Sequence, residues 1–248
     1  MISKNPFEHV EMPQMRQNEV VHLSQHELLA LLDALPDTTH GCCCELILWT
    51  GLRKSEVAGL EWQDVDFNEG VIYVKRTKQY LWSIENGVKA DHQALDVRPT
   101  KSKKGFRRIP MKPETRKLFE RQLAEQKRER LLYAKVWTGG YPGAPNMCVF
   151  ATHVGTVPDM ANARKTLRRA CSEAETKLIT LHPLRHSCLT AIARGGKVDL
   201  RTLAELAGHE KPSFTAEKYM HSDPFAMSDA LDVLGERLKK TSKRRGKV

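Results

Sequence analysis

The side chains of this 248-residue chain that could do chemistry lie in five separate stretches. A tyrosine can act as a nucleophile, a histidine can accept or donate a proton, and a guanidinium can hold an anionic oxygen through its planar fork of N–H groups. In chain order the candidates are Arg53, Lys101, the pair His182 and Arg185, His209, and Tyr219. Together they would suit phosphoryl transfer, because arginines match phosphate oxygens in geometry and charge.

Each candidate also has an ordinary explanation when it is taken alone. Tyr219 is more simply a core aromatic, His182 a helix cap or core histidine, and Lys101 a solvated lysine. Arg53 can pair with Glu56 three residues further on. These residues therefore indicate a function only when their order and spacing along the chain are considered together.

The stretch LHPLRHS concentrates three of the polar side chains on one predicted helix. Pro183 is expected at the first helical position, which places His182 and Arg185 one turn apart on the same face. His186 lies four residues after His182, but the glutamate of the zinc motif H-E-x-x-H is missing. The sequence therefore predicts no metal site here.

Several function classes are excluded by missing motifs. The chain has no G-x-x-x-x-G-K and no G-x-G-x-x-G, so nucleotide-driven chemistry and a doubly wound fold are not expected, and no cofactor is predicted. The six cysteines form no C-x-x-C pair and are interpreted as reduced, buried small hydrophobes. No apolar run is long enough for a membrane span, and a cytoplasmic location is expected.

Positive charge is concentrated in two short segments. The net charge is +10, and residues 98–108 and 239–248 each contain six Lys or Arg residues and no acid. Without these segments, 28 basic residues face 30 acidic ones. Such localised charge is typical of contact with nucleic acid, although a solvated loop and tail would give the same pattern.

The predicted elements are mostly helical. An S-x-x-E capping box over residues 24–27 opens one helix, and the apolar run 42–49 indicates a buried helix that ends at Gly51. Residues 70–76, 94–99 and 106–111 have strand character, and the path of 77–93 stays open. Further helices are expected over 54–60, 113–135, 158–175, 183–194, 199–207, 213–221 and 225–239. The fold class is therefore mainly α with a small antiparallel β-sheet (α+β).

Four motifs, TGLRKSEVAGLEWQDVDF, TKSKKGFRRIP, LHPLRHSCLTAIARGG and LAGHEKPSFTAEKYMH, occur in this order. They resemble the catalytic domain of the tyrosine recombinases, the phage and transposon integrase family, over residues 21–238. The resemblance implies the integrase catalytic-domain fold. Residues 1–20 then look like a linker or remnant after an absent core-binding domain, and 239–248 form a basic tail.

The resemblance also implies a role for each matching residue. The family's catalytic positions correspond to Arg53, Lys101, His182, Arg185, His209 and Tyr219, with Glu56 as a supporting acid. Tyr219 would be the nucleophile, His182 the general base and Lys101 the general acid, although Lys103 and Lys104 share the same turn. Lys103, Lys104 and Arg107 would contact the DNA backbone.

The implied activity is site-specific cleavage and rejoining of double-stranded DNA through a 3′-phosphotyrosyl link, for integration or excision of a mobile element. A homo-tetramer is expected on DNA in the nucleoid, a monomer when free, and accessory DNA-bending or excision factors can take part. Two alternatives stay open at this point. One is strand cleavage of the type IB topoisomerase kind, and the other is a truncated, non-catalytic DNA-binding regulator.

Overall fold

The computed structural model describes residues 21–85, 88–100, 105–140, 143–145, 147–196 and 198–209, together with 213 and 215. Its helices are α1 (Gln25–Ala34), α2 (Thr39–Thr50), α3 (Lys54–Gly59), α4 (Pro113–Leu132), α5 (Met160–Glu173), α6 (Leu181–Arg194) and α7 (Leu200–Ala207), with a short 3-10 helix at Trp62–Asp64. Its strands are β1 (Val65–Asp66), β2 (Val71–Val74), β3 (Arg76–Glu85), β4 (Val88–Pro99) and β5 (Arg107–Pro110). The α+β expectation is confirmed.

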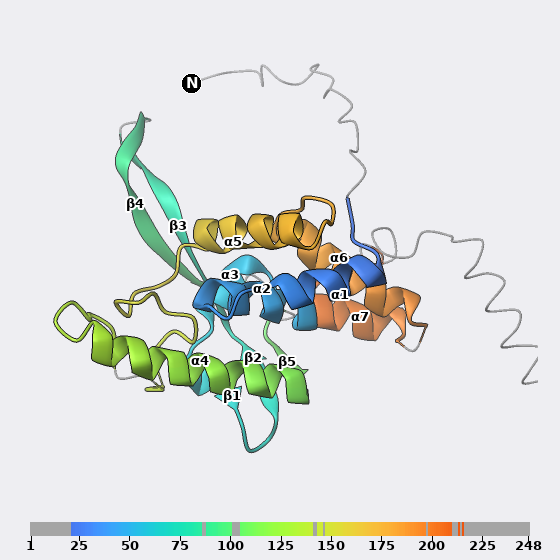
Figure 1. Cartoon of the computed structure of the whole chain (residues 1–248), viewed down its shortest axis with the longest axis horizontal. Helices are drawn as coiled ribbons and strands as arrows, with labels where there is room; N and C mark the ends of the chain where they lie inside the picture. The colour runs from blue at the N-terminus through green and yellow to red at the C-terminus, as the bar shows by residue number, and fades with distance from the viewer. Residues whose placement is uncertain are drawn as a thin grey trace, which may run out of the picture.

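Helix α2 forms the centre of the molecule. Eight of its twelve residues are buried, including the run Cys42–Cys44, and α4, α5 and α6 all pack against it (Figure 1). A helix that is apolar over most of its surface must be largely enclosed, and the sequence of α2 meets that condition except near Glu45 and the exposed Trp49. All six cysteines are buried free thiols. Burial raises the pKa of Cys44 to about 12, which keeps this thiol protonated.

Three of the predicted helix ends are confirmed. Ser24 caps α1 in a complete capping box with Glu27, and Pro113 occupies the first turn of α4. Helix α2 ends at Gly51, whose φ of 65° lies in the left-handed region that favours glycine. Helix α6 begins two residues earlier than expected, because Thr180 is its N-cap, and Pro183 therefore lies third in the helix.

The β structure differs from the expectation of one sheet. Strands β1, β2 and β5 form an antiparallel sheet in the order β1-β2-β5, with Ile72 opposite Ile109. Strands β3 and β4 instead pair with each other as a separate hairpin that projects from the helices (Figure 1). Residues 94–99, expected in the first sheet, belong to this hairpin, as does most of the segment 77–93. The sequence contains the hairpin signal Asn86-Gly87 between the two strands.

Several expectations lie outside the described residues. These are the linker over 1–20, the turn 101–104, most of the helix expected at 213–221, the helix at 225–239 and the basic tail. Within the described part of the chain, no helix is long and apolar enough to cross a membrane.

Candidate active site

Three arginines from different elements converge on the C-terminal end of α7. The last carbonyls of a helix have no partner within the helix, and here three consecutive ones each accept a hydrogen bond from a different guanidinium. Arg107 Nε donates to the carbonyl of Leu206 at 2.9 Å, Arg185 Nη2 to that of Ala207 at 2.6 Å, and Arg53 Nη2 to that of Gly208 at 3.0 Å. The negative end of the helix dipole offsets the repulsion among the three cations.

Gly208 makes this convergence sterically feasible. Its φ is 63°, in the left-handed region, and it ends α7. A Cβ atom at this position would lie 2.9 Å from Arg107 Nη1 and 3.1 Å from Arg53 Nη1. Because real Cβ atoms do not approach other atoms so closely, a side chain at position 208 would displace the guanidiniums.

Glu56 joins two of the three arginines. Its carboxylate accepts from Arg53 Nη1 and from the Arg53 backbone N–H, both at 2.8 Å, and binds both terminal nitrogens of Arg107 at 2.8–2.9 Å. The side chain of Glu56 is 2% exposed and that of Arg107 6%. Burial alone would raise the pKa of Glu56, but the hydrogen bonds and charge of Arg107, with those of Arg53, lower it to about 2.

Arg185 is held at two helix ends. Its Nη1 donates to the carbonyl of Gly51 at the end of α2, while its Nη2 reaches the end of α7. Only 2% of its surface is exposed. A guanidinium fixed by two helix ends loses little further freedom when it binds a ligand, which favours anion binding at its edge.

His209 follows directly after Gly208 and lies between Arg185 and Thr215. Arg185 Nη2 lies 3.4 Å from Nε2 of His209, and Thr215 Oγ1 lies 2.9 Å from Nδ1. Since a guanidinium can only donate, this contact assigns the acceptor role to Nε2, and in the neutral ring Nδ1–H then donates to Thr215. Thr215 is fully buried, so it fixes the orientation of the ring.

His182 is exposed and lies on the first turn of α6. Its Nε2 is 2.7 Å from Nε2 of the buried His186, and the two rings meet edge to face. One nitrogen of this contact must carry a proton and the other must accept it. The spacing of four residues on one helix already indicated that the two rings could meet.

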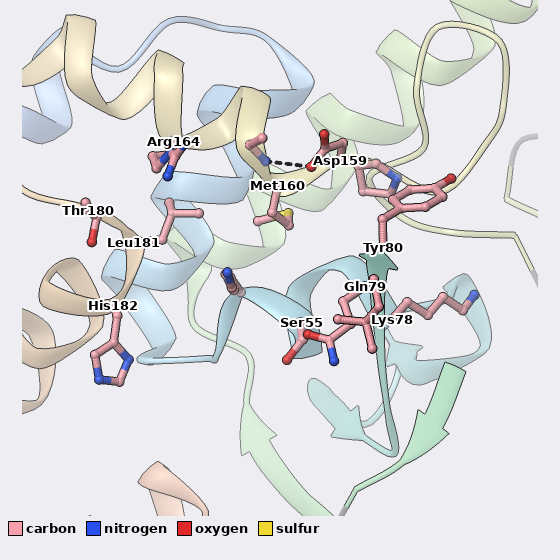
Figure 2. A pocket seen from close by; sticks show the side chains of 14 residues that line it. Ser55, Lys78, Gln79, Tyr80, Asp159, Met160, Arg164, Thr180, Leu181 and His182 are labelled. Carbon is pink, nitrogen blue, oxygen red and sulfur yellow. Dashed lines mark hydrogen bonds between the residues drawn. The ribbon is translucent and has the colours of Figure 1, made fainter. Parts of the chain in front are cut away.

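A pocket of about 370 Å³ lies beside the arginine cluster. Figure 2 shows His182 at one end of the pocket and Tyr80 with Lys78 at the other. Lys54 and Ser55, which follow Arg53, also line it. The pocket therefore brings His182 next to the start of α3, whereas the three arginines and His209 lie outside its lining.

Four of the six catalytic candidates lie in the described part of the chain. Arg53, Arg185 and His209 gather at the end of α7, and His182 lies nearby. Lys101 and Tyr219, together with Lys103 and Lys104, lie outside the described residues. Among the described side chains at this helix end, three arginines and one glutamate leave two net positive charges, which suit a phosphate.

Arg107 occupies a different environment from the one expected of a DNA-contacting residue. Its guanidinium faces inward and binds Glu56, whereas the exposed residues of β5 are Arg108 and Pro110. The alternation of β5 contains the signal for this burial, because Arg107 shares a face with the core residue Ile109. The placement does not support a direct contact between Arg107 and DNA.

Comparison with known proteins gives a match over most of the chain. The model of the phage integrase family matches residues 21–225. A tyrosine recombinase XerC-like protein from Caldanaerobacter subterraneus subsp. tengcongensis is 27% identical over 89% of this chain and 55% of its own length. The transposase from transposon Tn916 of Enterococcus faecalis is 27% identical over 71% of this chain and 41% of its own length. The chain spans about half the length of these curated relatives.

Solved structures share the fold. The integrase of transposon Tn1549, in complex with transposon right-end DNA, superposes with a TM-score of 0.67 at 22% identity, covering 94% of this chain and 73% of that one. The XerA recombinase gives a TM-score of 0.59 at 21% identity, covering 92% of this chain and 67% of that one.

Proposed function

This chain belongs to the phage integrase family of tyrosine recombinases, and from that premise we propose that it cleaves and rejoins DNA strands at a specific site through a 3′-phosphotyrosyl intermediate. The observation that carries the proposal is the convergence of Arg53, Arg185 and His209 on the end of α7. These side chains come from three separate helices and helix ends, and their positive charge suits the oxygens of a phosphate.

In the proposed reaction Tyr219 attacks the scissile phosphorus, and a bond from its phenolic oxygen forms while the bond to the 5′-oxygen breaks. His182 accepts the phenolic proton, which is needed because an ordinary tyrosine has a pKa of about 10. Lys101 donates a proton to the departing 5′-oxygen. Arg53 and Arg185 stabilise the charge on the non-bridging oxygens.

His209 supports the same step from the end of α7. A phosphate bound beside Arg185 would separate its guanidinium from Nε2 of His209. The negative charge of the phosphate favours a second proton on the ring, which then donates to a phosphate oxygen while Nδ1–H stays on Thr215. Rejoining is the reverse reaction, in which a 5′-hydroxyl attacks the 3′-phosphotyrosyl link. Because this link preserves the energy of the broken phosphodiester bond, rejoining needs no ATP.

The partner in this proposal is double-stranded DNA. The solved relative from Tn1549 is bound to transposon DNA, and Tn916 is a transposon, so we extend the proposal to integration or excision of a mobile element. Lys103 and Lys104 would contact the backbone beside the scissile phosphate. Exchange between two duplexes requires the cleavage of four strands, and a homo-tetramer on DNA would supply one active site for each strand. We propose that the free chain is a monomer and that accessory DNA-bending or excision factors assist the reaction. A nucleoid location follows from the DNA partner.

The comparisons do not favour either alternative function. A type IB topoisomerase would relax supercoiled DNA without joining two duplexes, whereas a recombinase forms a synaptic complex. A non-catalytic regulator would bind DNA without forming a covalent adduct. Native gels with two differently labelled duplexes, run beside a supercoil-relaxation assay, separate these readings.

The nucleophile is tested on a pool of nicked duplexes that are randomised around the nick and labelled at the 5′ end of the cut strand. Cleavage near the nick releases a short fragment and traps the protein on DNA. We expect Tyr219→Phe to abolish the adduct on denaturing gels and to leave DNA affinity within about threefold, because only one hydroxyl is removed. Adducts that persist in this variant, or a wild-type chain that forms none, would refute the proposed function.

A further inference from the structure

We propose that Arg107 is a positioning residue that couples the parts of the active site without touching DNA. This inference rests on the proposed function, because it concerns the same phosphate site. Arg107 lies on β5 with its side chain 6% exposed, and its hydrogen bonds run to α3, to the end of α7 and to Gly105 in its own segment.

The first connection runs through Glu56 to Arg53. Arg107 holds both oxygens of the carboxylate in a two-pronged pair, and the same two oxygens bind the backbone N–H and Nη1 of Arg53. A carboxylate fixed on one side by a buried guanidinium can orient a second guanidinium on its other side. Arg53 is the more exposed member, with 38% of its side chain accessible, so it is the one that a phosphate can reach.

The second connection runs to the helix end that carries His209. Nε of Arg107 donates to the carbonyl of Leu206 at 2.9 Å, one residue before the carbonyl that Arg185 holds. Arg107 therefore anchors the last turn of α7 to strand β5. Loss of this anchor would let the turn, and with it His209, move relative to Arg185.

The third contact is local and lies in the segment that leads into β5. Nη1 of Arg107 also lies 3.3 Å from the carbonyl of Gly105, the residue that immediately follows the turn 101–104. The proposed general acid Lys101 belongs to that turn. One guanidinium thus joins the carboxylate that binds Arg53 to the helix end before His209, and it also contacts Gly105.

A lysine could not replace these contacts. The five N–H groups of a guanidinium lie in one plane and point in fixed directions, which allows the carboxylate and two carbonyls to be bound together. An ammonium keeps the charge on a single nitrogen and loses the planar fork. Arg107→Lys therefore preserves the charge and disturbs the geometry.

The experiment compares Arg107→Lys with wild type on the nicked duplex pool. We expect adduct formation at saturating DNA to slow by about tenfold to a hundredfold, since small misplacements of catalytic groups have effects of this size. DNA affinity, measured in the Tyr219→Phe background, is expected to stay within about threefold. Arg76→Lys is the matched control, because Arg76 is also partly buried and bound to the carboxylates of Glu61 and Asp64. It is expected to cleave at the wild-type rate.

Three outcomes would overturn the inference. A tenfold loss of affinity with an unchanged saturated rate would make Arg107 a DNA contact, and an unchanged rate and affinity would leave it no positioning role. If Arg107→Lys and Arg76→Lys slowed adduct formation equally and had the same thermal stability, the slower reaction would reflect destabilisation of the fold alone. If Arg107→Lys does not fold, the double variant Glu56→Gln/Arg107→Gln, which removes the charges as a pair, is expected to show the same slow cleavage. A wild-type chain without adducts refutes the proposed function instead.

Discussion

Replacement of Glu56 by glutamine should destabilise the folded protein in a way that depends on pH. Glu56 is 2% exposed and binds two guanidiniums, so its charge is stabilised in the folded state. Glutamine has nearly the same shape but no charge, and its amide nitrogen cannot accept from an arginine. The substitution leaves the buried Arg107 without its counter-ion, which is the costly way to break a buried pair.

The size of the expected loss of stability follows from the pKa of Glu56. Folding lowers it from the ordinary value of 4.5 to about 2, because the two arginines outweigh the effect of burial. A shift of one unit corresponds to about 1.4 kcal/mol, so the charged carboxylate contributes about 3 kcal/mol to the free energy of unfolding at pH 7. A lowered folded-state pKa gives stability that is full above pH 4.5 and is lost as the pH falls towards 2. The difference between wild type and Glu56→Gln should therefore narrow below pH 4.5.

Urea unfolding of both proteins between pH 7 and pH 3 measures this difference. We expect wild type and Glu56→Gln to differ in their free energy of unfolding by about 3 kcal/mol at pH 7, and this difference to be about 2 kcal/mol smaller at pH 3. Other titrating groups affect both proteins equally and cancel in the difference. Glu125→Gln is the control, since its ion pair with Arg128 is largely exposed, and it should cost less than about 1 kcal/mol. A difference below 1 kcal/mol at pH 7, or one that stays constant with pH, would refute the electrostatic account of Glu56.

Two further predictions concern the end of α7. Thr215→Val removes the hydrogen-bond partner of His209 Nδ1, and we expect it to lower the free energy of unfolding by about 1 kcal/mol and to slow adduct formation. An unchanged rate of adduct formation would show that catalysis does not depend on this hydrogen bond. Gly208→Ala should lower both stability and cleavage, because a Cβ would crowd two guanidiniums. Gly70→Ala, with a similar φ of 65° and nothing within 4 Å, isolates the backbone strain, so equal losses in the two variants would exclude crowding.

Local sequence patterns predicted the helices well because their signals are local. The capping box at Ser24 and the glycine at position 51 define helix ends through contacts within a few residues, and both occur as expected. The apolar run that begins at Cys42 predicted the central buried helix for the same reason. The hairpin β3–β4 was not predicted, although the sequence carries the hairpin signal Asn86-Gly87 between its strands.

Residue types and their order in the sequence pointed to one family, and the model of that family matches residues 21–225. The tertiary structure alone decided which side chains meet. Nothing local links Arg53, Arg107 and Arg185, which become neighbours because the unsatisfied carbonyls at the end of α7 need donors from outside the helix. The same need turns Arg107 inward, because a buried carboxylate and a buried helix end hold a guanidinium more strongly than solvent does.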